Sequence, residues 1–302
     1  MRPLPPAFLC LSLVLVSACG AKRFTPPSGP GTPFSGYASA YDQATGDCRA
    51  VKTMTATLAL SGRAGTQRLR GRVDAGFAAP SQARLEGRAP FGRPVFILVA
   101  RDDAAATLVL PRDNRILRAA PPAAIVEALA GVALTPAELR AAMAGCGFGG
   151  APADGRAYGD WLVVDTPDAS SYLRRTDGRW RVIASTRGPL TIEYRDFAGG
   201  RPSTVRMRTA AASASGGAPT DLTVKLSDVS INVTLEPAVF EVEMPEGAEP
   251  LTLEELRRAG PLAPAAGASR NQPPPRLRRS AGASAKAESG ERQRVGVGPH
   301  AH

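Results

Sequence analysis

Histidine is almost missing from this chain of 302 residues, which has only His300 and His302 near its C-terminal end. A Ser–His or Cys–His nucleophile needs an imidazole within hydrogen-bond reach, so such catalysis is excluded from the body of the chain. A histidine-rich metal site is excluded for the same reason. We therefore expect a protein that is not an enzyme and that carries neither a cofactor nor a metal.

Long hydrophobic runs are scarce as well. The apolar stretch from Ala7 to Val16 follows Arg2 and is well short of the ~20 residues that span a bilayer. It leads into Val16-Ser17-Ala18-Cys19, a small-residue cleavage site typical of a secretory signal peptide. A cysteine directly after the cut resembles the lipobox of bacterial lipoproteins, in which the cysteine receives acyl chains such as palmitate. We predict a signal peptide over 1–18 and lipid attachment at Cys19; the alternative is an ordinary signal peptide with an incidental cysteine.

Only four cysteines are present. Cys10 leaves with the signal peptide and Cys19 takes the lipid, so Cys48 and Cys146 remain in an exported, oxidising compartment. A disulfide between them would close a long loop. Two separately buried thiols are the alternative at this point.

The positive charge is unevenly distributed. The net charge is +10, but residues 260–302 hold seven Lys or Arg and only two acidic residues. We predict that 261–302 is a disordered basic tail, and that the Pro-, Gly- and Ser-rich segment 19–46 is a flexible tether. The domain between them, 47–260, is only mildly basic, and export argues against a nucleic-acid partner.

Alternating apolar and polar residues dominate the domain. Such period-2 runs predict strands with one face buried and one in water. They occur at 54–60, 68–77, 83–88, 190–194, 205–208 and 222–235, with further strands at 94–100, 107–110, 115–118, 161–164, 171–175 and 180–185. We predict a mainly β fold, a curled antiparallel sheet or unclosed β-barrel of about 11–13 strands. Aromatic residues are only 5% of the chain, so the inside of such a sheet can remain an apolar cavity.

Two helices are expected midway along the chain. Pro121 and Pro122 precede Ile125 and Leu129, which share a helical face. Thr135-Pro136-Ala137-Glu138 is a capping box with proline in the first turn, and Leu139 and Met143 follow at helical spacing. Gly145 is suited to end the second helix. We predict a two-helix lid over the sheet.

Three segments, in order, resemble the LolB family of outer-membrane lipoprotein receptors. Ala89-Pro90-Phe91-Gly92 comes before an apolar strand, where the family has Pro-Leu-Gly. The second segment has the residue spacing of the family's helices, at Gly131, Leu134-Thr135-Pro136 and Gly145. The third segment is Asp177-Gly178-Arg179-Trp180, which leads into the last paired strands. The resemblance covers about Arg49 to Leu235. Ala142, where the family often has Trp, and the basic tail depart from it.

The resemblance implies an unclosed barrel with a helical lid over an apolar cavity. Such a protein takes lipoproteins from a periplasmic carrier and inserts them into the outer membrane, so its partners are acyl chains, a carrier and the membrane. Pro90, Phe91 and Gly92 would form a membrane-contact loop, unless Phe91 folds back onto the core. We expect the cavity or lid to be lined by Ile125, Leu129, Leu139, Met143, Trp161 and Trp180.

Other interpretations stay open. The domain could be a filled β-domain that scaffolds an envelope complex, and an envelope hydrolase would need a nucleophile system that the chain lacks. Every second position of one predicted strand is an arginine, at Arg68, Arg70 and Arg72. These residues form either a solvated face or a contact for anionic lipid or an acidic carrier. The Gly-rich stretch 145–150 satisfies GxGxxG but follows a helix, so we predict a loop rather than a dinucleotide site. Gly20 after the lipid cysteine favours the outer membrane.

Overall fold

A single sheet of fifteen strands organises the described part of the chain, which is residues 23–89, 94–210 and 219–259 of a computed structural model. The longer strands of the N-terminal half are β2 (Thr53–Ala64), β3 (Gln67–Ala78), β4 (Gln82–Gly87), β5 (Phe96–Ala100), β6 (Ala106–Leu110) and β7 (Arg115–Ala120). Those of the other half are β8 (Asp154–Tyr158), β9 (Trp161–Asp165), β10 (Ser170–Thr176), β11 (Arg179–Arg187), β12 (Leu190–Ala198), β13 (Arg201–Thr209) and β14 (Thr220–Ile231).

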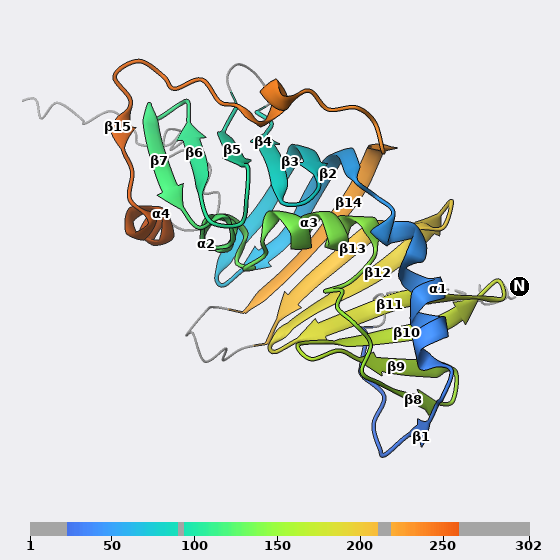
Figure 1. Cartoon of the computed structure of the whole chain (residues 1–302). Helices are drawn as coiled ribbons and strands as arrows, with labels where there is room; N and C mark the ends of the chain where they lie inside the picture. Colours follow the sequence, from blue (N-terminus) through green and yellow to red (C-terminus); the bar gives the residue numbers. More distant parts are fainter. Residues whose placement is uncertain (1–22, 90–93, 211–218, 260–302) are drawn as a thin grey trace, which may run out of the picture. The chain divides into compact units, whose positions relative to one another are not determined.

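The sheet consists of two antiparallel meanders, β2–β7 and β8–β14, which are joined by the pairing of β14 with β2. Its two outermost strands are β1 (Thr32–Pro33) and β15 (Glu249–Pro250), and they do not pair with each other, so the sheet is unclosed (Figure 1). The predicted fold class, a curled and unclosed mainly β architecture with helices inserted midway, is confirmed. Strands β1 and β15 have two residues each and β8 lacks alternation, so the sequence pattern did not predict them.

The longest alternation in the sequence, 222–235, continues as a strand only to Ile231. The pairing of β14 with β2 shifts between Ser227 and Ser230, and Asp228 has a φ of 53°. Beyond the bulge, Ile231 lies opposite Met54 and packs against the core again. Of the predicted inward positions, Val229 in the shifted stretch and Val233 after the strand are exposed instead of buried.

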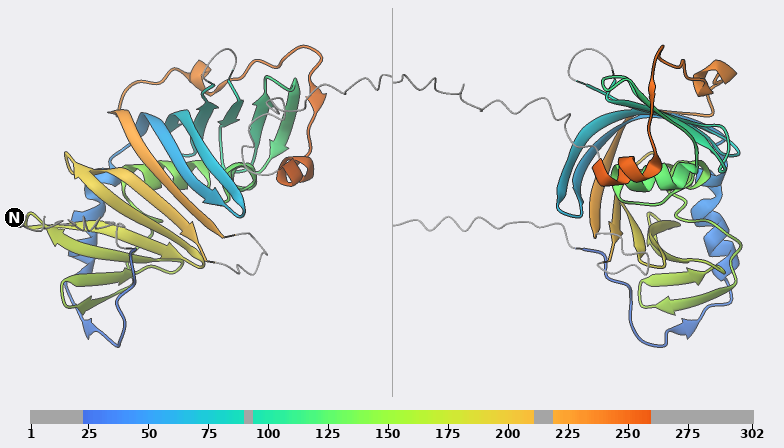
Figure 2. Two further views of the ribbon diagram at one scale, coloured as in Figure 1. Left: turned by 180° about the vertical axis from the view of Figure 1, so that it is seen from behind. Right: turned by 90° about the vertical axis from the view of Figure 1, so that its left-hand side faces the viewer.

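The local helix signals act as predicted. Helix α2 (Pro122–Ala130) ends at Gly131 and α3 (Pro136–Ala144) ends at Gly145, both in the left-handed conformation that favours glycine. Thr135 and Glu138 form a capping box at the start of α3. Both helices lie against the concave face of the sheet (Figures 1 and 2).

Helix α1 (Tyr37–Arg49) differs from the flexible tether that the composition of 19–46 predicts. Its buried residues are Ala40, Tyr41, Thr45 and Cys48. Ala40 and Tyr41 pack with Leu162, Val164 and Leu173 of β9 and β10, and Cys48 packs in the main core. The Pro, Gly and Ser residues are concentrated before Phe34, so the compositional average hid a short helix that tertiary packing stabilises.

A C-terminal segment wraps back along the first meander. After β14 it runs through the 3₁₀ turn η1 (Pro237–Phe240) and β15 into α4 (Leu253–Ala259), as Figure 1 shows. Arg84 donates to the carbonyl of Glu241 at 2.8 Å, and Arg101 donates to the carbonyl of Phe240 at 3.2 Å. Helix α4 then packs beside α2, with Leu256 buried in the core.

Cys48 and Cys146 form a disulfide with a Cα–Cα distance of 5.5 Å. The bond joins the end of α1 to the residue after Gly145, and it closes a loop of 98 residues in sequence separation. It therefore attaches the N-terminal helix to the lid. A covalent link across so long a loop stabilises the native state chiefly by restricting the unfolded chain.

Replacing both cysteines, in Cys48→Ser/Cys146→Ser, is expected to lower the free energy of unfolding by about 2–5 kcal/mol. Urea unfolding followed by circular dichroism measures the change. The matched control is the wild-type chain with its disulfide reduced, which is expected to unfold at the same urea concentration as the double variant. An unchanged midpoint in both would contradict the stabilising role.

Candidate functional site

An apolar cavity lies between the lid helices and the concave face of the sheet. Its volume is about 70 Å³. Side chains from β2–β5, β13 and β14 form the floor, and side chains from α2, α3 and the loop between them form the roof. All of the lining residues are apolar: Leu58, Leu60, Val73, Phe77, Leu85, Phe96, Val126, Leu129, Ala130, Val132, Leu139, Met143, Met207, Leu222 and Val224.

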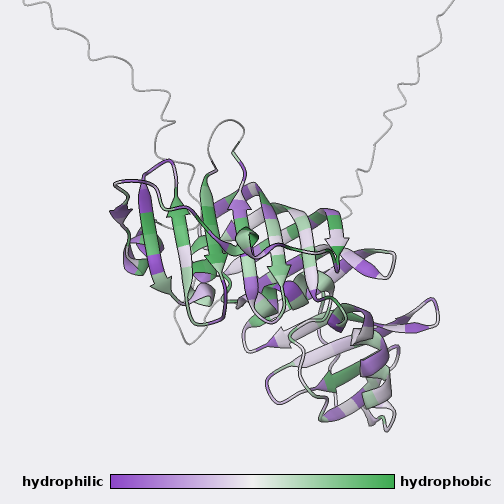
Figure 3. Ribbon diagram, turned by 45° about the horizontal axis from the view of Figure 1, so that its top comes forward, coloured by the Kyte–Doolittle hydropathy of each residue, from purple (hydrophilic) through white to green (hydrophobic). Residues whose placement is uncertain are grey.

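The sequence pattern explains why these residues meet. Leu58 and Leu60 alternate with exposed or half-buried neighbours on β2, and Val73 does the same on β3, whereas Phe77 lies in the fully buried end of that strand. Leu129 on α2 and Met143 on α3 belong to the apolar faces of their helices. The apolar face of the sheet therefore packs against the apolar faces of the two helices, because amphipathic elements bury their apolar sides against each other. In Figure 3 the strands next to β7 are the most continuously hydrophobic.

Some of the predicted lining residues lie at the cavity and others do not. Leu129, Leu139 and Met143 line it, and Ile125 is fully buried in the same core without lining it. Trp180 packs instead beside α1, where its backbone N–H donates to the side chain of Gln43 at 2.9 Å.

Trp161 also lies away from the cavity. Its ring is 5.6 Å from that of Phe24, in the N-terminal segment. The composition of 19–46 predicts a free tether. With that segment taken as free, the cavity was the only apolar partner expected for the two tryptophans. Cys19, Pro90, Phe91 and Gly92 lie outside the described residues.

The cavity is small for a lipid. An apolar cavity that binds benzene measures about 150 Å³, roughly twice the volume available here. It holds at most a few methylene groups while the lid is in place. Any longer acyl chain therefore has to displace α2 or α3, whose side chains fill the rest of the space.

Helix α3 is fixed to the sheet by a charged pair at its N-terminal end. Glu138 accepts a hydrogen bond from the Arg187 guanidinium of β11, and its second oxygen accepts the backbone N–H of Thr135 at 2.8 Å. Burial opposes ionisation of Glu138, but these hydrogen bonds outweigh it and hold the pKa of its carboxyl below the usual value. Arg187 also stacks on Phe148, with its guanidinium carbon 4.4 Å from the ring centroid.

Helix α2 is held by weaker contacts. The carbonyl of Gly131 accepts the hydroxyl of Thr220 at 3.0 Å, and Glu127 faces Arg257 of α4 at 3.6 Å. The Glu127 and Arg257 side chains are 40% and 53% exposed, so their pair contributes little. The polar contacts of the lid are therefore stronger at α3 than at α2, which is held mainly by the burial of its apolar side chains.

The Gly-rich stretch after α3 is a loop, as predicted. Its Gly147 N–H donates to the hydroxyl of Tyr194 on β12 at 2.8 Å. Tyr194 is buried, and burial raises its pKa. Sequence reasoning did not identify this anchor, because one tyrosine in a strand gives no signal for a hydrogen bond to a distant loop.

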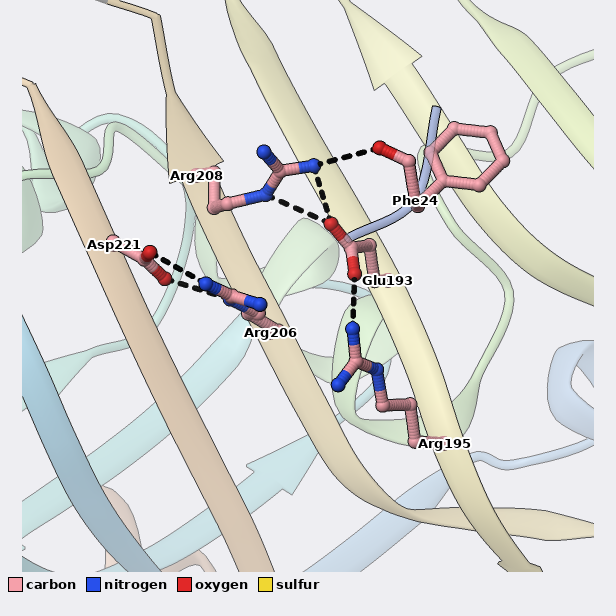
Figure 4. Close-up of polar contacts among 6 residues, drawn as sticks. All are labelled: Phe24, Glu193, Arg195, Arg206, Arg208 and Asp221. Atoms are coloured by element: carbon pink, nitrogen blue, oxygen red, sulfur yellow. Dashed lines mark hydrogen bonds and ion pairs between the residues drawn. The ribbon is translucent and has the colours of Figure 1, made fainter. Parts of the chain in front are cut away.

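The outer face of the sheet carries a different kind of cluster. Glu193 is 2% exposed and accepts hydrogen bonds from Arg208 at 2.8 Å and from Arg195 at 2.9 Å (Figure 4). Arg206 forms a paired contact with Asp221 on the neighbouring strand at 2.7 and 2.6 Å. The backbone carbonyl of Phe24 accepts a hydrogen bond from Arg208 at 3.2 Å.

Within 23–89, 94–210 and 219–259, no group of three or more His, Cys, Asp or Glu side chains is placed to hold a metal ion. Over the same ranges, the structure contains no helix of the length and apolarity that crossing a bilayer requires.

Comparison with solved structures finds likenesses of low identity. A LolA superfamily protein from Nitrosomonas europaea is 12% identical over 67% of this chain and 94% of its own, with a TM-score of 0.44. A DUF1329 family protein from Desulfovibrio piger is 10% identical over 67% and 96%, with a TM-score of 0.43. The lipoprotein LppX from Mycobacterium tuberculosis is 8% identical over 66% and 96%, with a TM-score of 0.29.

No protein-family model matches the chain, and no curated protein matches its sequence. A function for the chain therefore has to be argued from its residues and its geometry.

Glu138→Gln is expected to lower the free energy of unfolding at pH 7 by about 1.5–3 kcal/mol, since it removes a charge-assisted hydrogen bond. Because the folded-state pKa is depressed, this stabilisation is complete above the unfolded-state pKa of about 4.3 and is lost as the pH falls through the lower folded-state value. The difference between wild type and variant should therefore vanish in acid. Urea unfolding across pH measures it.

Glu127→Gln is the matched control on the other lid helix, and its effect should stay below about 1 kcal/mol. Equal losses from the two variants would contradict the assignment of the stronger polar contacts to α3.

Proposed function

We propose that this chain is a lipid-anchored protein of the bacterial envelope that shelters acyl chains between its lid and its curled sheet. In this role it receives lipoproteins from a periplasmic carrier and releases them into the outer membrane. The observation that carries the proposal is the cavity itself, which has fifteen lining residues and not one polar side chain among them.

An acyl chain that moves between two membranes has to be kept out of water. Each methylene group moved from water into an apolar site gains about 0.8 kcal/mol, so an acyl chain does not cross water free. The cavity supplies such a site beside a lid whose polar contacts are weaker at α2. An entering chain would take over contacts now made by Val126 and Leu129, so the exchange of lid for lipid costs little net apolar burial.

The sequence supplies the second support. A signal peptide over 1–18 followed by Cys19, and the resemblance of three ordered segments to the LolB family, both favour an outer-membrane lipoprotein. The residues proposed for transfer are the lid side chains Leu129, Leu139 and Met143, with Phe91 as a membrane-contact side chain.

A scaffold of an envelope complex is the alternative, and the small volume of the cavity favours it. About 70 Å³ is also compatible with an ordinary packing void in a domain of this size. The two functions differ in one respect: a scaffold does not take up acyl chains.

Uptake of a fluorescent fatty acid by the mature chain with Cys19→Ala tests the proposal. We expect saturable binding by the wild-type cavity, and at least tenfold weaker binding by Ala130→Leu, because three added carbons fill the space that the first methylene groups would enter. Fluorescence titration measures both affinities.

Ala133→Leu is the matched control, since Ala133 is exposed in the loop between α2 and α3 and does not line the cavity. Absence of saturable uptake by the parent chain would rule out acyl shelter and leave the scaffold. Equal weakening by both substitutions would place binding outside the cavity.

A further inference from the structure

A row of cations crosses the outer face of the sheet, on the side opposite the lid. Arg63 at the end of β2 lies directly opposite Arg68 on β3. Arg70 and Arg72 follow on the same strand at every second position, opposite Ser61 and Ala59. Lys225 of β14 lies on the other side of Ala59, so the row continues across three strands. We call Arg63, Arg68, Arg70, Arg72 and Lys225 the basic face.

The basic face is not neutralised. All five side chains belong to exposed residues, and within the described ranges none of them forms an ion pair. Neighbouring cations do form ion pairs: Glu193 contacts Arg195 and Arg208, Asp221 contacts Arg206, and Asp74 contacts Arg88 beyond Arg72.

Like charges that face each other across two strands are destabilising. Arg63 also lies opposite Asp221 on β14, but that carboxylate is engaged in its paired contact with Arg206, so the Arg63–Arg68 arrangement has no ion pair of its own to offset the repulsion. A surface that retains this destabilising arrangement is better explained by the binding of an anionic ligand than by a contribution to folding.

The N-terminal segment reaches the same face. The ring of Phe24 packs edge-on against Tyr172 at 4.8 Å between centroids, and its carbonyl accepts from Arg208 (Figure 4). Arg23 and Arg208 share an open pocket of about 460 Å³ with Arg63. The chain thus leaves the described domain beside one end of the basic face.

The distance to the lipid is then short. Cys19 lies four positions before Arg23, and a fully extended chain covers at most about 3.6 Å for each step, roughly 14 Å in all. An acyl anchor on Cys19 would hold this edge of the sheet close to the headgroup layer. The separation is comparable with the screening length of about 8–10 Å at physiological salt, so the cations would feel an anionic surface.

We propose that the basic face docks on the anionic phospholipid headgroups of the membrane to which the chain is anchored. The proposal rests on lipid attachment at Cys19. In this orientation the outer face of β2, β3 and β14 lies on the bilayer, and α2, α3 and the cavity are turned towards the aqueous side, where a carrier can reach them. The N-terminal lipid would then hold the chain at the membrane, and the basic face would fix its orientation there.

Vesicle binding of the mature chain with Cys19→Ala tests the charge contact without the lipid. The vesicles contain one part phosphatidylglycerol to two parts phosphatidylcholine, and pure phosphatidylcholine serves for comparison. Arg68→Gln/Arg70→Gln/Arg72→Gln is expected to lower the partition coefficient for the anionic vesicles roughly 100-fold, about fivefold for each cation. The parent chain should show weak binding to the neutral vesicles.

The matched control, Lys52→Gln/Arg112→Gln/Arg118→Gln, removes the same charge from exposed positions outside the basic face. Its binding should fall much less, and the basic tail is identical in both variants. Equal losses would show a general charge effect, and no loss in the first variant would remove the face from membrane contact; either result overturns the proposal. Arg70→Glu provides a single-site check if the triple variant unfolds.

Orientation is tested on the lipidated chain in the same vesicles. A fluorophore on Arg70→Cys should be quenched by a nitroxide on the lipid headgroup, whereas one on Ala133→Cys, on the lid side, should not. Equal quenching overturns the proposal. Unchanged vesicle binding with impaired transfer from a carrier would assign the basic face to an acidic protein instead.

Uptake of the fluorescent fatty acid is expected to be the same in the Arg68, Arg70 and Arg72 variant as in the parent chain. Failure of acyl binding and failure of membrane docking are therefore separate results.

Discussion

A sheet that curls but does not close has an apolar inner face with no opposing sheet to cover it. In this chain, α2 and α3 supply that cover, and nearly every other feature follows from it. The capping box of α3, its charged attachment to β11, the disulfide to α1 and the packing of α4 beside α2 all hold the lid over Leu58, Val73 and their neighbours. Water would otherwise contact a continuous hydrophobic surface, at a cost of about 25 cal/mol for each Å².

The proposed exchange of the lid for an acyl chain depends on the same arrangement. Its buried side chains are aliphatic and make no directional contacts with the floor of the cavity, so a hydrocarbon chain can replace them in kind. The strengths of attachment differ between the two helices, since α3 has a half-buried charged pair whereas α2 has one hydroxyl contact and an exposed pair. Opening by movement of α2, with α3 as the fixed side, is consistent with this difference.

Features that depend on neighbouring residues were predictable from the sequence. Thr135 and Glu138 located the start of α3, and the Asp177-Gly178 pair located the hairpin between β10 and β11, because capping and tight turns are local chemistry. Helix α1 was not predicted, since its buried face is completed by strands more than a hundred residues away. The misplacement of Trp161 and Trp180 followed from that omission, because the segments against which they pack were taken to be free. The bulge in β14 coincides with a change in the apolar pattern, which moves from even positions up to Leu226 to odd positions from Val229 onward.

The edge strands of the sheet also affect how it can associate with other chains. Its outermost strands, β1 and β15, are two residues long, and each contains a proline, Pro33 and Pro250. Proline lacks the N–H that a further strand would need, and so short an edge offers few other bonds. Lateral growth by strand addition is thereby disfavoured where β1 covers β8 and β15 covers β7. In the proposed function, encounters with aggregation-prone lipidated cargo would then be left to the broad surfaces of the sheet.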